Sequence, residues 1–225
     1  MAVARAPPKE HVHVGVVTSA ATGQTAPGRT EETIFMDAVG YKLFRKKDGR
    51  LYPLFVNSNK EVPLGVWVNA ENGERNERGQ VKSRLGGLAF RPGWHINSVV
   101  PYVDHIYTTH NGVRYMKDNT VWCEVLYHTD ISYQEEAHNN GVNASTNHFA
   151  PMNAYIKKIP VDGYYEYRTK PDMKFPWVIA GEMCVTREMT ISEVKALCGR
   201  YGLSPLVPYK KVGTGSGMAP VAAPQ

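Results

Sequence analysis

The chain has 225 residues and a formal net charge of +5, with 42% hydrophobic and 10% aromatic residues. This composition excludes a chain that is disordered throughout, and the length suits one large domain or one domain with mobile ends. No apolar run approaches the roughly 20 residues of a membrane-spanning helix, and the N-terminal "MAVARAPPKEHVHVG" lacks the apolar stretch of a signal peptide. We therefore expect neither membrane insertion nor secretion by a signal peptide.

Both ends of the chain are predicted to lie outside the folded domain. Residues 1–38 are expected to form a flexible arm, because "TSAATGQTAPGRTEE" is small, polar and interrupted by Pro27 and Gly28. Within this arm, "HVHVGVV" alternates and predicts a strand that can pair with a neighbour, with His11 and His13 on one face. Residues 209–225 are rich in Gly, Ser, Pro and Ala and predict a disordered tail. The core domain is therefore expected over residues 39–208.

The core begins with a predicted β-hairpin. "YKLFRK" and "LYPLFVN" flank "KDG", an Asp-Gly turn, and Pro53 favours an edge position or a late start for the second strand. This hairpin is basic, and its charges are Lys42, Arg45, Lys46, Lys47 and Arg50. Such a patch can attract nucleic acid or an acidic partner, and the alternative is a hairpin tip that its charge keeps soluble.

Further strands follow along the chain. "GLAFRPGWHI" predicts a strand interrupted at Pro92-Gly93, while "GYYEYRT" and "PWVIAGEMCVTREM" predict others. The strongest strand pattern is "TVWCEVLY", whose alternation puts Cys123 and Val125 on one face and Trp122 and Glu124 on the other. The polar stretch over residues 128–153 is long for a plain connection and predicts a lid-like loop or a surface insertion.

One helix is predicted, in "TISEVKALCGRYG" near the C-terminus. Thr190 or Ser192 can cap its N-terminus, and Gly199 or Gly202 can end it. The expected fold is therefore an α+β, mostly β single domain of antiparallel strands with one C-terminal helix. The three cysteines are widely spaced and form no C-x-x-C motif, so that neither a zinc site nor a disulfide is predicted.

The candidate site lies in "RPGWHINSVVPYVDH". Pro92-Gly93 predicts a turn that presents Trp94 and His95 at the start of a strand. Trp94 can form a flat wall for a ring, His95 can exchange a proton near neutral pH, and Arg91 can hold a phosphate or carboxylate. The alternative is structural: the indole anchors the turn, the imidazole binds the backbone and the guanidinium pairs with a carboxylate.

Glu124 is a carboxylate in the middle of an otherwise apolar strand. If it faces the core, it needs a partner such as Arg91 or His95, and a shifted pKa would then mark a functional site. If it faces solvent, it needs no partner. Asp104, His105 and His110 would ligate a metal only if their loop folded back, and no metal site is predicted.

Five blocks of the chain, taken together and in order, resemble a family of uncharacterised proteins of phages and prophages. The blocks are "YKLFRKKDGRLYPLFVNSNKEVPLGVWVNAE", "LAFRPGWHI", "TVWCEVLY", "IPVDGYYEYRTKPDM" and "WVIAGEMCVTREMTISEV", which span residues 41–205. The resemblance implies a mobile-element origin, and hence a place in the host cytoplasm or the virion, but no particular reaction.

The order of strands is also similar to that of ADP-ribosyltransferase-like folds. This similarity would place Arg45, His95 and Glu124 in a site that takes NAD. The chain lacks the Ser-Thr-Ser, His-Gly-Thr and Gln/Glu-x-Glu motifs of those folds.

Two functions follow as hypotheses. In the first, the chain is a phage accessory enzyme or ligand-binding domain for NAD or another nucleotide. Its catalytic residues would be His95 and Glu124, and its ligand-binding residues Arg91, Trp94, Tyr41 and Arg45. This first hypothesis requires a concave pocket that holds Trp94 and His95, with Glu124 pointing into it. In the second, the chain is a non-catalytic virion-associated or assembly protein that contacts a phage or host protein. These side chains are then packed, and apolar surface is exposed elsewhere.

Overall fold

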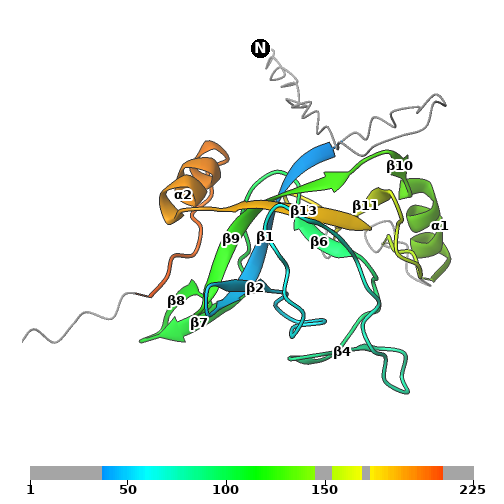
Figure 1. Cartoon of the computed structure of the whole chain (residues 1–225), viewed down its shortest axis with the longest axis horizontal. Helices are drawn as coiled ribbons and strands as arrows, with labels where there is room; N and C mark the ends of the chain where they lie inside the picture. The colour runs from blue at the N-terminus through cyan, green and yellow to red at the C-terminus, as the bar shows by residue number, and fades with distance from the viewer. Residues whose placement is uncertain (1–36, 145–153, 169–172, 210–225) are drawn as a thin grey trace, which may run out of the picture.

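The computed structural model describes residues 37–144, 154–168 and 173–209. Within these ranges the chain forms thirteen strands and two helices (Figure 1). The strands are β1 (Asp37–Lys47), β2 (Arg50–Tyr52), β3 (Trp67–Asn69), β4 (Val81–Ser83), β5 (Gly86–Leu88), β6 (Trp94–Asn97), β7 (Tyr107–His110), β8 (Val113–Met116), β9 (Thr120–His128), β10 (Ile131–Ser132), β11 (Gly163–Tyr167), β12 (Trp177–Ala180) and β13 (Glu182–Glu188). The helices are α1 (Gln134–Ala144) and α2 (Ile191–Arg200).

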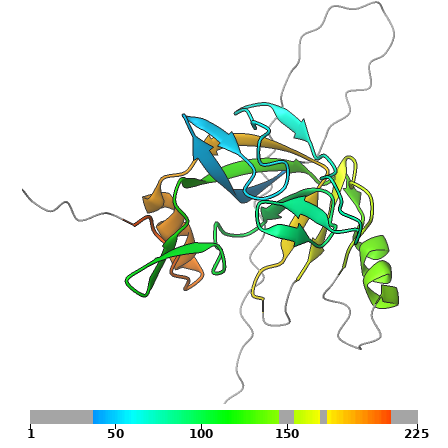
Figure 2. The ribbon, with the colours of Figure 1, turned by 90° about the horizontal axis from the view of Figure 1, so that it is seen from below.

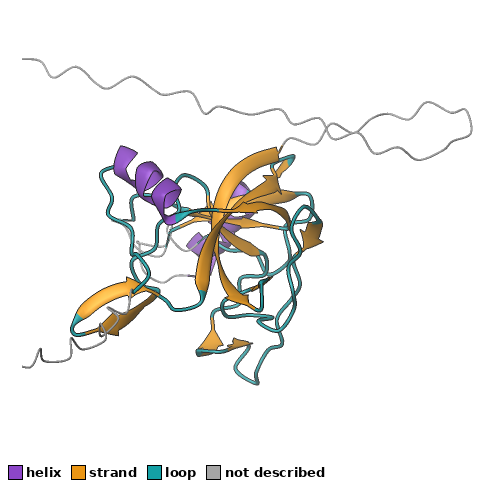
Figure 3. Cartoon of the chain, turned by 60° about the vertical axis from the view of Figure 1, so that its left-hand side comes forward, coloured by secondary structure: helices purple, strands orange, loops and turns teal. Residues whose placement is uncertain are grey.

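Nine of these strands form one sheet, in the order β10–β11–β12–β6–β1–β9–β13–β3, with β2 paired to β1. Its pairings between named strands are antiparallel, except for the parallel β10–β11 pair. Two short ribbons, β4–β5 and β7–β8, project from the main sheet (Figure 3). The α+β, mostly β prediction is confirmed.

The long central pair of the sheet is β1 with β9. Their register runs without interruption from Asp37 opposite His128 to Arg45 opposite Thr120. At the far end of β1, Asp48 and Gly49 both adopt positive φ, as the predicted Asp-Gly turn requires, and the chain returns as β2. β2 has three residues and stops directly before Pro53, because proline has no N–H to donate to a neighbouring strand.

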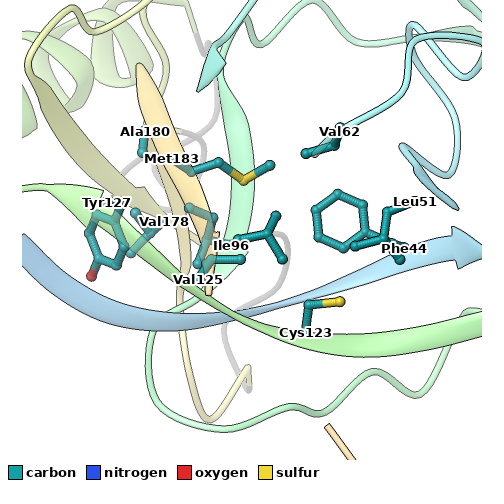
Figure 4. Packing of buried hydrophobic residues seen from close by; sticks show 11 residues of the cluster. Phe44, Leu51, Val62, Ile96, Cys123, Val125, Tyr127, Val178, Ala180 and Met183 are labelled. Atoms are coloured by element: carbon teal, nitrogen blue, oxygen red, sulfur yellow. The ribbon is translucent and has the colours of Figure 1, made fainter. Parts of the chain in front are cut away.

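The alternation of β9 gives the sheet two apolar faces. One face carries Cys123 and Val125, which pack with Phe44, Ile96 and Met183 in the largest cluster of buried side chains (Figure 4). The opposite face is covered by the helices, which lie at opposite ends of the sheet (Figures 1 and 2). The helix-covered clusters comprise Leu43, Trp122, Val194 and Cys198 beneath α2, and Ala137, Tyr165, Tyr167 and Ile179 beneath α1.

Helix α2 forms where the sequence predicts it. Thr190 is the N-cap: its hydroxyl accepts from the backbone N–H of Glu193, and the Glu193 carboxylate accepts from the Thr190 N–H. These reciprocal bonds satisfy two otherwise unpaired donors at the helix start. Gly202 follows the helix at a φ of 66°, in the left-handed region that glycine adopts without strain.

Helix α1 corrects the prediction that the fold has a single helix. It lies within the polar stretch that was expected to be a loop or an insertion. Glu135 and Glu136 stand in its first turn, where carboxylates favour a helix N-terminus. Its contact with the sheet is small: Ala137 is fully buried, and the side-chain amide of Gln134 exchanges two hydrogen bonds with the backbone of Glu166 in β11. The apolar stripe by which most helices can be predicted from sequence is therefore nearly absent from α1.

The arm and the tail lie almost wholly outside the described residues, as do His11 and His13. Cys123, Cys184 and Cys198 are buried free thiols. No helix in the described ranges is long and apolar enough to cross a membrane.

Candidate functional site

The neighbouring strands β1 and β6 part soon after they meet. Tyr41 opposite Asn97 is the only residue pair recorded between them in the described part of the chain. Each strand continues on its other side, β1 with β9 and β6 with β12. A cavity of about 230 Å³ lies where they part, and we call it the β1–β6 cavity. Its walls include Lys42, Trp94, His95, Asn97, Trp122 and Trp177.

The Pro92-Gly93 turn places Trp94 at the first position of β6, as predicted. Gly93 has a φ of 137°, and a Cβ atom there would stand 2.3 Å from Ile179 Cγ2. Only glycine therefore fits this position without a shift of its neighbours. The Trp94 indole N–H donates to the Val68 carbonyl at 2.8 Å. This bond fixes the plane of the ring against the cavity.

The side chain of Lys42 lines the cavity instead of joining the basic surface of the hairpin. Its Nζ donates to the His95 carbonyl at 2.6 Å and lies 5.5 Å from the centre of the Trp94 ring. No carboxylate in the described ranges lies within ion-pairing distance of this amine. Burial lowers the pKa of Lys42 to about 7. Lys42 shares its side of β1 with Gly40 and Phe44, a period of two that could have indicated the inward direction.

His95 stands beside this amine on the cavity wall. The pKa of His95 is lowered to about 3: burial is the largest cause, the charges of Lys42 and Arg91 add to it, and a hydrogen bond with the Gly93 backbone opposes them. The imidazole is thus neutral at pH 7. It can accept or donate a hydrogen bond, but the predicted proton exchange near neutral pH does not fit this environment.

Arg91 lines a second cavity, of about 560 Å³, which we call the Arg91 cavity. Its guanidinium carbon lies 4.6 Å from the centre of the Tyr167 ring. The Nε atom is buried without a hydrogen-bond partner, and the described residues offer the guanidinium no carboxylate partner. The two cavities share part of their lining, including Phe55, His95 and His105. The two cavities therefore adjoin one another, and we call them together the recess.

Glu124 does not reach this recess, which corrects its placement beside His95. Its carboxylate accepts from Arg187 Nη2 at 3.0 Å, and Arg187 Nη1 also donates to Glu193 of α2 at 2.7 Å. The carboxylate is held on the face that α2 covers. The predicted catalytic pair of His95 and Glu124 is not formed.

Tyr41 and Arg45 also lie outside the walls of both cavities. Tyr41 pairs with Glu124 in register and packs in the cluster beneath α2, where burial and the Glu124 charge raise its pKa. Arg45 donates to the Ser58 carbonyl, and its guanidinium carbon lies 5.0 Å from the centre of the Tyr52 ring. Of the six predicted site residues, the recess therefore contains Arg91, Trp94 and His95.

Most of the basic side chains of the hairpin make contacts within the protein. Lys46 pairs with Glu188 at 2.7 Å and Arg50 with Glu61 at 3.1 Å. Lys42 points into the β1–β6 cavity, whereas Lys47 is exposed. Nucleic-acid binding by this hairpin stays a prediction.

The three residues considered for a metal site are held by other contacts. Asp104 contacts His105 at 3.2 Å, whereas the His110 ring stacks on Tyr209 with centroids 3.9 Å apart. Across residues 37–144, 154–168 and 173–209, no group of three or more His, Cys, Asp or Glu side chains is arranged to hold a metal ion.

Comparison of the chain with protein-family models, curated proteins and solved structures finds no match. The resemblance to phage proteins accordingly stays a prediction. A function has to be inferred from the geometry of the recess.

Proposed function

We propose that this chain is a phage-borne accessory protein that binds a nucleotide-like anion in the recess formed by the β1–β6 and Arg91 cavities. The observation that carries the proposal is that two basic side chains, Lys42 and Arg91, lie beside aromatic rings in the recess. Lys42 and Arg91 both face the recess, and neither has a carboxylate partner among the described residues. The Arg91 guanidinium, together with the Lys42 amine in the half of the molecules in which it is protonated at pH 7, favours the binding of an anion in this partly buried recess.

The two parts of the recess suit the two parts of such a ligand. The β1–β6 cavity is walled by three indoles, Trp94, Trp122 and Trp177, which can pack against a flat ring. The Arg91 cavity adds a guanidinium and Lys117, which can bind phosphate or carboxylate oxygens. Ligand pockets of small molecules measure about 300–1,000 Å³; the Arg91 cavity of about 560 Å³ is of this size, and the β1–β6 cavity beside it adds about 230 Å³.

Binding is better supported than ADP-ribosyl transfer. Glu124 is held by Arg187, so it offers no carboxylate to a substrate in the recess. Glu71 lines both cavities, but its carboxylate is paired with Lys60. NAD remains one of the nucleotides that the recess would take, as a ligand rather than as a substrate.

The alternative of a virion or assembly contact is favoured by a different feature, an exposed apolar pair next to the edge strand β3. Leu64 and Val66 are 52% and 50% exposed, and β3 is the last strand of the sheet. An edge with apolar neighbours can pair with a strand of a phage or host protein. This contact and ligand binding in the recess use different surfaces.

The test is a thermal-melt series of the full chain with ATP, GTP, NAD and their mononucleotides. A ligand at 100 times its Kd adds about 2.7 kcal/mol of stability, which raises Tm by several degrees in a domain of this size. In Arg91→Gln, the ligand concentration that produces the same shift in Tm should be at least tenfold higher. Arg50→Gln is the matched control, since it removes an exposed cation that is paired with Glu61 outside the recess.

Two results would overturn the proposal. One is a melting temperature that no nucleotide moves at millimolar concentration. The other is a shift that Arg91→Gln and Arg50→Gln reduce equally, because the ligand would then bind by general charge and not in the recess.

A further inference from the structure

Two lysines of β1 have opposite surroundings. The Lys46 amine is paired with the Glu188 carboxylate at 2.7 Å, and its side chain is 41% exposed. Among the residues that the structure describes, no carboxylate is paired with the Lys42 amine, which donates one hydrogen bond, to the His95 carbonyl. The aromatic rings of Trp94 and Phe44 lie 5.5 and 5.8 Å from Lys42 Nζ. Lys42 is therefore a lysine amine without the partner that usually keeps it charged.

These surroundings favour the neutral form of the amine. An ammonium loses hydration when it is buried, and one carbonyl and two ring faces replace only part of it. The resulting pKa of about 7 leaves about half of the amines unprotonated at pH 7. A neutral amine carries a lone pair, and desolvated lysines of this kind act as nucleophiles toward carbonyl groups.

The amine is also accessible to a small molecule. Lys42 lines the β1–β6 cavity, which has a volume of about 230 Å³ and adjoins the Arg91 cavity through shared lining residues. The hydrogen bond to the His95 carbonyl fixes the position of Nζ at this wall. A reactive group, a fixed position and free space therefore coincide at Lys42.

We propose that Lys42 forms an imine with the carbonyl group of an anionic aldehyde or ketone that is bound in the recess. This inference rests on the proposed binding function and narrows its ligand to carbonyl-bearing anions. Arg91 would bind the acidic group of the ligand, and the indole walls would hold its ring or carbon chain.

The step balances without an oxidant or reductant. The lone pair of Lys42 Nζ attacks the carbonyl carbon, and the carbonyl π electrons move to the oxygen. A proton passes from nitrogen to that oxygen and gives a carbinolamine. The oxygen then leaves as water with a second proton from the nitrogen, and a carbon–nitrogen double bond remains.

Pyridoxal 5′-phosphate is a suitable probe, because it combines an aldehyde, an aromatic ring and a phosphate. The full chain is incubated with limiting probe, reduced with borohydride to fix any imine as a secondary amine, and digested for peptide mass spectrometry. We expect Lys42 to be labelled at least tenfold faster than Lys46 and Lys47. Labelling spread evenly over the surface lysines would overturn the proposal.

Two variants separate chemistry from folding. Lys42→Arg keeps a cation that can donate to the His95 carbonyl, but its guanidinium does not form an imine. The absorbance of the imine with pyridoxal 5′-phosphate, read before reduction, should therefore disappear while the variant stays folded. Lys47→Met removes an exposed lysine of the same strand and should leave that absorbance unchanged. An imine signal that survives Lys42→Arg would contradict the assignment to Lys42.

Pyridoxine 5′-phosphate, which lacks the carbonyl, distinguishes the two proposals. If it binds with a measurable Kd but Lys42 is not labelled by the aldehyde, the imine is ruled out and anion binding stands. If Lys42 is labelled selectively but neither pyridoxine 5′-phosphate nor any nucleotide binds, the lysine is reactive and the nucleotide-binding function is wrong. Selective labelling that pyridoxine 5′-phosphate suppresses supports both.

Discussion

The imidazole of His128 lies stacked on the indole of Trp67, with ring centroids 4.0 Å apart, and each of its nitrogens contacts a carboxylate. Nδ1 is 2.8 Å from Asp37 Oδ1, and Nε2 is 3.2 Å from Glu182 Oε2. Asp37 begins β1, His128 ends β9, Glu182 begins β13 and Trp67 begins β3. One buried side chain thus connects four consecutive strands of the sheet.

We expect His128→Gln to destabilise the fold by about 2–4 kcal/mol, because it leaves two largely buried carboxylates with a poorer partner. The measurement is urea unfolding followed by circular dichroism at pH 7. The matched control is His105→Gln, which breaks the contact with Asp104, where both side chains are more than half exposed. This control should cost about 0.5 kcal/mol or less. Equal losses in the two variants would show that His128 does not hold the strands together.

The helix cap of α2 gives a second prediction. Thr190→Ala removes the side-chain bond to the Glu193 N–H and should lower the free energy of unfolding by about 1 kcal/mol. Ser204→Ala, an exposed position after the helix, is the control and should change it little. If both variants unfold at the same urea concentration as the parent chain, the cap contributes nothing.

The same cap predicts a loss of stability in acid. Hydrogen bonds from the Thr190 backbone and hydroxyl, and then from Arg187, lower the pKa of Glu193 to about 2 from an ordinary value of 4.5. Because the folded-state pKa is the lower one, the contribution is complete above pH 4.5 and is lost as the pH falls toward 2. Urea unfolding of the parent chain and Glu193→Gln between pH 2 and 6 should give curves that converge in acid. A constant gap over this range would contradict the shift.

Local pattern predicted the parts of the fold that depend on neighbours in the sequence. The alternation from Val121 to Tyr127 gave β9 and its two faces, and the Thr190 cap with its apolar stripe gave α2. The Asp48-Gly49 turn gave the first hairpin. In each case the physical cause lies within a few residues, so a single sequence contains it.

The recess depends on pairing between distant segments, which a single sequence does not contain. Lys42 belongs to a run of basic residues, which is typical of a surface; the alternation of β1 could have indicated its side of the strand, but the cavity on that side depends on the parting of β1 from β6. Glu124 was expected near His95, yet its partner is Arg187, 63 residues further along the chain. Helix α1 was missed for another reason: it buries so little apolar surface that its sequence is typical of a loop.

His95 gives a fourth stability effect, because a histidine that is buried in its neutral form must lower stability in acid. Its pKa is about 3 in the folded chain and 6.5 ordinarily, so the unfolded chain binds more protons between these values. Stability therefore rises with pH from 3 to 6.5, by up to about 1.4 kcal/mol per pH unit. His95→Gln should flatten this part of the profile, measured by urea unfolding from pH 4.5 to 7.5. Parallel profiles for the two proteins would mean that His95 is protonated in the folded chain.

Lys42 predicts a slope on the alkaline side. Its pKa is about 7 in the folded chain, against 10.5 for the ordinary amine. The unfolded chain binds the extra proton between these values, so the Lys42 contribution makes the parent chain more stable as the pH rises from 7 to 10.5. Lys42→Met removes this contribution, so its advantage over the parent chain should be largest at pH 7 and should shrink toward pH 10.

Urea unfolding at pH 7, 8, 9 and 10 tests this slope, with Lys47→Met as the control for loss of a charge from β1. Tyrosine and cysteine titrations are common to all three proteins and cancel in the differences. If the free energies of unfolding of the parent chain and of Lys42→Met change in parallel with pH, the Lys42 amine keeps its proton in the folded chain. It would then bind an anion as a fixed cation, but it would lack the lone pair that imine formation requires.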